Sequence, residues 1–139
     1  MIILSYTLFI IFFALSALHI SWGFGSSFGF EDAIPKNEDG KPMLKPKKID
    51  SIIVGLGLLM FGSFYLIKVN VIPLQLPSVV ISVANWVIPI IFLLRAIGDF
   101  RYVGFTKKIR STQFARKDTR FYSPLCLTIA IIGFILRMA

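Results

Sequence analysis

Four long apolar runs alternate with polar connectors along this chain. The runs cover about residues 2–22, 51–69, 78–98 and 121–138. Each comes close to the roughly 20 predominantly apolar residues that a helix needs to cross the hydrocarbon core of a bilayer. No strand-like alternation and no internal repeat interrupts the runs. The pattern therefore predicts one integral membrane domain over residues 1–139, an all-α protein built as a four-transmembrane-helix bundle.

We interpret the first run as a retained helix rather than a cleaved signal peptide. No lysine or arginine precedes it, and its apolar part is longer than a signal-peptide core. Small residues recur on one face of each of the first two predicted helices, which favours close helix packing in a membrane. These residues are Ala14, Ala17 and Ser21 in the first helix and Ser51, Gly55 and Gly62 in the second.

The two long connectors, about residues 23–50 and 99–120, lack a regular apolar period, so we expect loops there. Asp50 or Ser51 is the expected N-cap of the second helix. Ser123 is the expected cap of the fourth helix, because proline follows it at a position suited to the first helical turn.

Charge supports the membrane assignment and predicts an orientation. Hydrophobic residues make up 56% of the chain, and 15 lysines and arginines face 7 acids, for a net charge of +8. The long connectors carry twelve of these basic residues, while the opposite side carries only Lys68 and Arg137. The positive-inside rule then places both long loops in the cytoplasm and both termini outside. Anionic lipid head groups explain this charge better than nucleic acid, for which the pattern offers no binding fold.

Ionisable residues near the end of the third apolar run mark the candidate site. At the spacing of a helix, Asn85, Arg95 and Asp99 fall within a sector of roughly 80°. Charges within a membrane usually face a bundle interior or a wet cavity. Because the first and third helices run in the same direction, we expect His19 and Trp22 at a similar depth.

These positions and their polar neighbours on the loops form a predicted ligand-binding set. The set is Arg95, Asp99, His19, Trp22, Arg101, Tyr102, Asp118 and Tyr122. The alternative is structural. Arg95 then only extends toward the interface and pairs with Asp99 at i+4, and Trp22 is an interfacial belt residue.

Other motifs offer little chemistry. The glycine-rich segment GFGSSFG at 23–29 follows a membrane helix rather than a strand and lacks the Gly-Lys-Ser/Thr of a phosphate loop, so nucleotide binding is not predicted. A single histidine and the single Cys126 provide no metal-ligand spacing and no internal disulfide. No motif identifies a cofactor. The basic run Lys107, Lys108 and Arg110 is typical of a solvated surface that faces lipid head groups.

Three stretches carry a resemblance to a known family: His19-Ile-Ser-Trp22-Gly23, then Arg95-Ala-Ile-Gly98-Asp99-Phe-Arg101-Tyr102-Val-Gly104-Phe, then Phe114-Ala with Asp118-Thr and Tyr122-Ser-Pro124-Leu-Cys126. In them the chain resembles DUF3995, a family of small bacterial membrane proteins of unknown function. The resemblance covers nearly the whole chain apart from the first loop. It implies a four-helix protein of a bacterial plasma membrane, and it groups His19, Trp22, Arg95, Asp99 and Asp118 as one set. It implies no substrate.

Three functional hypotheses follow, and the sequence does not decide between them. The first is a protein that binds a lipid or another amphiphilic or anionic small molecule at the cytoplasmic membrane interface, with Arg95 contacting the anion and Asp99 orienting Arg95. The second is a membrane-embedded enzyme acting on a lipid or isoprenoid, with His19 as the acid/base, because the ordinary pKa of histidine lies near neutrality. The third is an oligomeric transporter, which is less favoured because the charges cluster at one membrane face. Homo-oligomerisation stays open.

Overall fold

The computed structural model describes all 139 residues and contains four helical segments long and apolar enough to cross a membrane. The helices are α1 (Ile2–Gly23), α2 (Lys48–Lys68), α3 (Ser78–Ile97), α4 (Gln113–Lys117) and α5 (Ser123–Met138), with a short 3₁₀ turn η1 (Glu31–Ala33) and a π-helix η2 (Asp118–Tyr122). Because α4, η2 and α5 follow one another without a break, they form the fourth membrane segment. The predicted all-α bundle of four membrane-spanning helices, and the multi-pass membrane protein that it implies, are confirmed.

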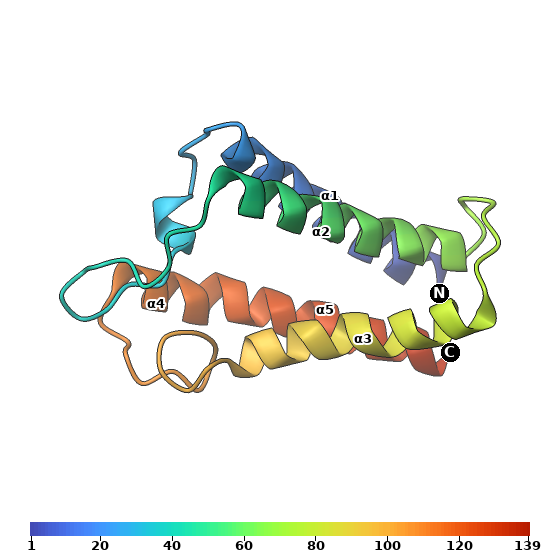
Figure 1. The fold of residues 1–139 in the computed structure, drawn as a ribbon. Helices are drawn as coiled ribbons and strands as arrows, with labels where there is room; N and C mark the ends of the chain where they lie inside the picture. Colours follow the sequence, from blue (N-terminus) through green and yellow to red (C-terminus); the bar gives the residue numbers. More distant parts are fainter.

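The helices form two antiparallel pairs, α1 with α2 and α3 with α5 (Figure 1). Both termini and the short connector 69–77 lie at one end of the bundle, which we call the termini end. The two long connectors lie together at the other, which we call the loop end. Residues from the first and third connectors are therefore neighbours in space.

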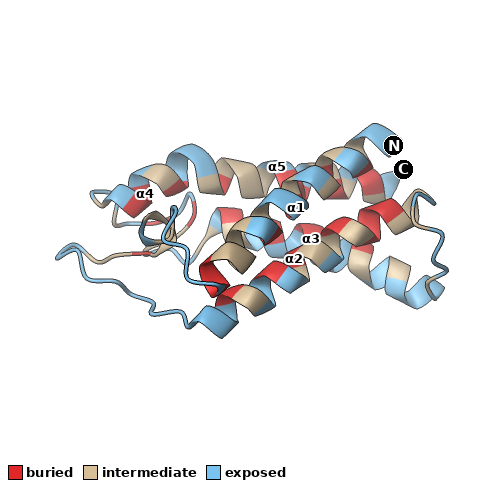
Figure 2. Ribbon diagram, turned by 90° about the horizontal axis from the view of Figure 1, so that it is seen from above, coloured by how far each residue is buried: buried red, intermediate tan, exposed pale blue.

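One core joins all four membrane segments. The Phe12 ring of α1 lies 5.2 Å from the Phe92 ring of α3 and 6.2 Å from the Tyr65 ring of α2, and Ile129 of α5 is fully buried in the same cluster. Buried residues follow the facing sides of the helices, while the outer sides are exposed (Figure 2). These exposed outer sides are strongly apolar, as lipid contact requires.

The predicted small-residue face of α2 is the contact surface with α1. A Cβ added at Gly55 would lie only 2.7 Å from the Ile20 side chain, and the Ser16 hydroxyl donates to the Gly55 carbonyl at 2.6 Å. The predicted face of α1 is wrong, because Ala14 and Ala17 are exposed. The α1 side of the contact is formed around Ser16 instead.

The fourth membrane segment begins eight residues earlier than the apolar run indicates, so the prediction of a loop up to residue 120 is wrong. Thr112 is the N-cap, and its hydroxyl accepts a hydrogen bond from the Ala115 N–H at 3.1 Å. Ser123 is therefore inside the helix rather than at its cap. Hydropathy missed this turn because a charged sequence with a good cap can be helical without being apolar.

The second helix also begins earlier than predicted. Lys47 is the N-cap, and Asp50 occupies the third helical position rather than the cap itself. The Asp50 carboxylate accepts from the Lys47 N–H at 2.7 Å, which satisfies a donor at the helix start. The N-terminus of α2 therefore lies at the loop end, beside the segment that follows α1.

Candidate functional site

Asp118 joins three segments at the loop end of the bundle. It is fully buried at the first position of η2. Its Oδ1 accepts from Nη2 of Arg95 at 2.9 Å, while its Oδ2 accepts from Nζ of Lys107 at 3.1 Å and from the Gly104 N–H at 2.7 Å. One carboxylate thus ties the end of α3 and the connector 98–112 to the fourth helix.

Lys107 is the principal residue that sequence reasoning missed. The side chain is almost fully buried, and its ammonium also donates to the Gly104 carbonyl at 2.9 Å and to the Thr119 hydroxyl at 2.6 Å. The interpretation as part of a solvated run is therefore wrong for Lys107, although the adjacent Lys108 is exposed. Nothing in the local charge pattern separates these two lysines, because only the fold of the loop turns one inward.

Two glycines allow the loop after α3 to fold tightly. Gly98 and Gly104 have φ of 94° and 84°, a backbone region that favours glycine. A Cβ at Gly98 would lie 1.8 Å from the Val103 carbonyl oxygen, and one at Gly104 would lie 2.4 Å from the Ile97 carbonyl oxygen. The chain therefore crosses itself at backbone contact, which brings Gly104 and Lys107 to Asp118.

Asp99 organises this loop from within. Its Oδ1 accepts from the backbone N–H groups of Arg101, Tyr102 and Val103 at 2.9, 2.7 and 2.9 Å. Partial burial alone would raise the pKa of Asp99, but these backbone hydrogen bonds outweigh it and hold the pKa below its usual range. The Asp99 carboxylate therefore stabilises the loop by accepting hydrogen bonds from the backbone amides that follow it.

The predicted partnership between Arg95 and Asp99 is wrong. No ion pair joins them, and the partner of Arg95 is Asp118, 23 positions later in the chain. Helix periodicity suggested Asp99 because it lies at i+4, but α3 ends at Ile97 and the chain turns at Gly98. Asp99 therefore leaves the helical face on which Arg95 lies.

Arg95 keeps an unused hydrogen-bonding group. Its Nη1 is buried and has no partner in the protein, although the side chain as a whole is one-third exposed. With Lys107, the cluster holds two cations around one carboxylate. The buried hydroxyl of Ser123, whose backbone N–H donates to the Asp118 carbonyl, also lacks a partner. The arrangement has a surplus of positive charge and of hydrogen-bond donors.

One other buried charged group lacks a partner at one of its atoms. It is Nε of Arg137 at the termini end, where the guanidinium lies 5.2 Å from the centre of the Trp86 ring. That cation–π contact accounts for its placement. Arg95 has no such aromatic contact.

The first long connector reaches the fourth helix through Asp32. Lys117 forms an ion pair with the Asp32 carboxylate, and the Tyr122 hydroxyl lies 3.5 Å from the Asp32 carbonyl oxygen. This contact joins the first connector to the fourth membrane segment at the loop end. Tyr122 thus touches the first connector.

His19 and Trp22 form a separate group. Nδ1 of His19 donates to the Leu15 carbonyl at 2.8 Å, and the two rings lie 4.7 Å apart. Trp22 is only 8% exposed, and its indole N–H donates to the Phe28 carbonyl at 2.7 Å. No hydrogen bond or ion pair connects this group to the Asp118 cluster. Of the predicted set, the structure brings together Arg95 with Asp118, His19 with Trp22, and Asp99 with Arg101 and Tyr102.

Arg101 and Tyr102 take part mainly in their own loop. The Arg101 guanidinium lies 5.1 Å from the centre of the Tyr102 ring. The side chains of these two residues make no hydrogen bond to the Asp118 cluster. They stay on the surface of the connector and are candidates for contact with a head group rather than with the buried cluster.

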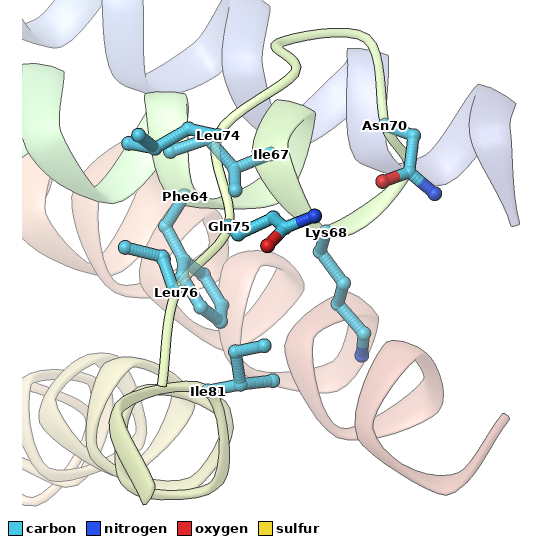
Figure 3. A pocket seen from close by; sticks show the side chains of 8 residues that line it. All are labelled: Phe64, Ile67, Lys68, Asn70, Leu74, Gln75, Leu76 and Ile81. Atoms are coloured by element: carbon cyan, nitrogen blue, oxygen red, sulfur yellow. The ribbon is translucent and has the colours of Figure 1, made fainter. Parts of the chain in front are cut away.

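A surface hollow of about 390 Å³ lies at the termini end between α2, the short connector and the start of α3 (Figure 3). Its one charged group is Lys68. The Lys68 ammonium donates to Asn85 Oδ1 at 2.9 Å and to the Leu136 carbonyl, so it holds α3 and α5 against α2. Asn85 therefore accepts a hydrogen bond at the termini end and lies apart from the Asp118 cluster. The Lys68 ammonium is thus engaged by two neutral acceptors, and the other polar side chains of the hollow are Asn70 and Gln75.

Comparison with known proteins gives a family but no function. A family model described as "Protein of unknown function (DUF3995)" matches residues 12–133. No curated protein and no solved structure matches the chain. The match covers both the Asp118 cluster and the His19–Trp22 group.

Proposed function

The chain belongs to the DUF3995 family, whose function is unknown, and we propose that it binds the anionic head group of a membrane lipid or a similar amphiphile at the loop end of the bundle. Arg95 is the main contact in this proposal. Asp118 and Lys107 hold the surrounding structure. The apolar outer faces of the helices accommodate the acyl chains.

The observation that carries the proposal is the unpartnered, buried Nη1 of Arg95. A charged donor without an acceptor is costly in a membrane protein, so it is commonly paired or functional. Asp118 accepts from Nη2 of the same guanidinium at 2.9 Å and thereby fixes the orientation of the guanidinium plane. A phosphate or carboxylate oxygen at Nη1 would complete the hydrogen bonding and neutralise the surplus charge.

The local backbone supports a binding role. Asp118 begins a π-helical turn, a feature that appears frequently at functional sites in α-helices. The same turn places the unpartnered Ser123 hydroxyl one hydrogen-bonded turn from Asp118. The Arg95 side chain is one-third exposed although Nη1 itself is buried, so a ligand approaches the guanidinium from the surface and reaches Nη1 after a local side-chain movement.

Charge supports a cytoplasmic position for this end in the cell membrane. Thirteen of the fifteen lysines and arginines belong to the loop end, together with all seven acids, and only Lys68 and Arg137 lie at the termini end. The positive-inside rule favours the cytoplasm for the more basic side. The inner leaflet also carries the anionic lipids that the proposal requires. The enzyme and transporter hypotheses lack comparable support, since His19 lies apart from the charged cluster.

Thermal unfolding of the purified protein in detergent tests the proposal. An anionic phospholipid such as phosphatidylglycerol should raise the unfolding temperature, because a ligand at 100 times its Kd stabilises by about 2.7 kcal/mol, whereas zwitterionic phosphatidylcholine should not. Arg95→Lys keeps a positive charge beside Asp118 but lacks the second nitrogen donor of the guanidinium. It should lose most of the lipid-induced rise in unfolding temperature. Arg116→Gln removes an exposed charge from the same end and is the matched control. Equal shifts in the parent and both variants would overturn the proposal.

A further inference from the structure

A second polar hollow lies at the loop end, separate from the Asp118 cluster. It has a volume of about 320 Å³ and lies between the glycine-rich segment after α1 and the start of α2. No carboxylate lines it. Three hydroxyls, two ammonium groups and an indole contribute to its lining: Ser26, Ser27, Ser51, Lys47, Lys48 and Trp22.

The start of α2 supplies free backbone donors beside the hollow. The N–H groups of Lys48 and Ile49 donate to no backbone carbonyl. They lie at the positive end of a 21-residue helix, where an anion is stabilised. Asp50, the acid in the first turn of α2, accepts a hydrogen bond from the Lys47 N–H at 2.7 Å, so its carboxylate is already engaged at the helix start.

Ser51 provides an independent indication of a ligand. It is only 6% exposed, it lines the hollow, and its hydroxyl makes no hydrogen bond within the protein. An acceptor oxygen bound in the hollow would give this hydroxyl the hydrogen-bond partner that the protein does not supply.

The glycine-rich segment forms another wall of the hollow, with Ser26 and Ser27 in its lining. Gly25 has φ of 99°, and a Cβ added there would lie 3.5 Å from Nζ of Lys48. The Ser26 N–H donates to the Ser21 carbonyl at 3.0 Å, which holds the turn against the end of α1. Phe24 and Phe28, on either side of the serines, are 82% and 79% exposed. Exposed aromatic rings beside a basic hollow are typical of a surface at the level of lipid head groups.

We propose that this hollow binds a phosphate group, with Ser51, Lys48 and the free N–H groups of α2 as donors, and that the group belongs to a membrane phospholipid. Several donors from different directions suit a tetrahedral anion with several acceptor oxygens. The site uses neither Arg95 nor Asp118, so it is distinct from the site of the proposed function. The segment lacks a nucleotide-binding motif, and the chemistry here is that of a head group alone.

Binding of short-chain phosphatidic acid to the full-length protein in detergent, followed by native mass spectrometry, tests this site. Dioctanoylglycerol, which lacks the phosphate, is the ligand control and should not bind. Ser51→Ala and Lys48→Gln should each weaken phosphatidic acid binding roughly tenfold, the equivalent of one charge-assisted hydrogen bond. Lys45→Gln removes the same charge from the same connector outside the hollow and should change binding by less than about twofold.

Competition identifies the source of the phosphate. If inorganic phosphate displaces the lipid, and does so less well in Lys48→Gln, the site also accepts the free anion. If it fails to compete, the lipid is the ligand. Two results would overturn the site in favour of diffuse charge attraction. One is that phosphatidic acid binding weakens equally in Lys45→Gln and Lys48→Gln. The other is that Ser51→Ala folds normally and binds phosphatidic acid as well as the parent does. In an Arg95→Gln background, which removes the contact of the proposed function, Ser51→Ala and Lys48→Gln should still weaken the remaining phosphatidic acid binding, which separates the two proposals.

Discussion

The Lys107 ammonium and the Asp118 carboxylate lie 3.1 Å apart with side chains that are 1% and 0% exposed. This is a buried ion pair between a connector and a membrane helix. Arg95 shares the same carboxylate from the other side at 2.9 Å. The loop end of the protein is therefore organised around one acid that neutralises only one of two neighbouring cations.

Removing that acid should cost more than removing either cation. Asp118→Asn leaves Arg95 and Lys107 without a counter-charge, and breaking a buried pair in this way typically costs about 3–5 kcal/mol. Lys107→Met leaves a neutral Arg95–Asp118 pair and should cost less. Thermal unfolding followed by circular dichroism in detergent provides the comparison. A larger loss of stability for Lys107→Met would contradict this view of the cluster.

Gly98→Ala should open the connector that holds Lys107. The added Cβ would lie 1.8 Å from the Val103 carbonyl oxygen, so the backbone must move. Trypsin should then cleave after Lys108 faster than in the parent. Gly40→Ala is the matched control, because Gly40 also has a positive φ, 76°, but has open space around it. If both variants are cleaved at the parental rate, the tight crossing is not required for the loop.

Gly55→Ala should weaken the contact between α1 and α2, whereas Gly57→Ala should not. A Cβ at Gly55 would lie 3.1 Å from the Ser16 carbonyl oxygen, while Gly57 has nothing within 4 Å. Overpacking typically costs about 1–3 kcal/mol, and alanine for an unconstrained helical glycine gains roughly 0.5–1 kcal/mol. The two variants should therefore shift the unfolding temperature in opposite directions. Shifts of the same sign and size would show that the helices do not meet here.

The loop after α3 should lose order in acid through Asp99. Its pKa is held below the usual value, so its stabilising contribution is fully present at neutral pH, above the unfolded pKa of about 3.9. The contribution is lost as pH falls through the lower folded pKa. NMR should show the amide protons of Arg101, Tyr102 and Val103 shifting together below about pH 4. In Asp99→Asn this concerted shift should be absent, and its persistence would assign the transition to another group.

The sequence predicted the four membrane helices because hydropathy measures how apolar a segment is, and the hydrocarbon core of a bilayer requires apolar segments. It selected Arg95 as a candidate site residue because charges are rare in such segments, and it selected Asp118 as a polar neighbour on the following loop. It paired Arg95 with Asp99 wrongly, since periodicity extrapolates a helix past Gly98, where the backbone turns. It missed Lys107 because burial of a lysine depends on a loop that crosses itself, and no local pattern encodes that crossing.

The hollow lined by Ser51 and Lys48 is a second feature that the sequence did not predict. The glycine-rich segment lacks the motif of a nucleotide loop, so the sequence predicted no nucleotide there. It said nothing about a hydroxyl 22 or more residues later that the α1–α2 packing brings beside it. Contacts between distant segments, rather than residue types, define both candidate sites.

Native mass spectrometry of the protein extracted gently from its own membrane, beside Arg95→Lys, tests the central claim most directly. We predict that the parent retains one anionic amphiphile in stoichiometric amount and that folded Arg95→Lys does not. Retention of the same molecule at equal occupancy in the variant would contradict the claim, because the unpartnered guanidinium nitrogen would then have no role in holding it.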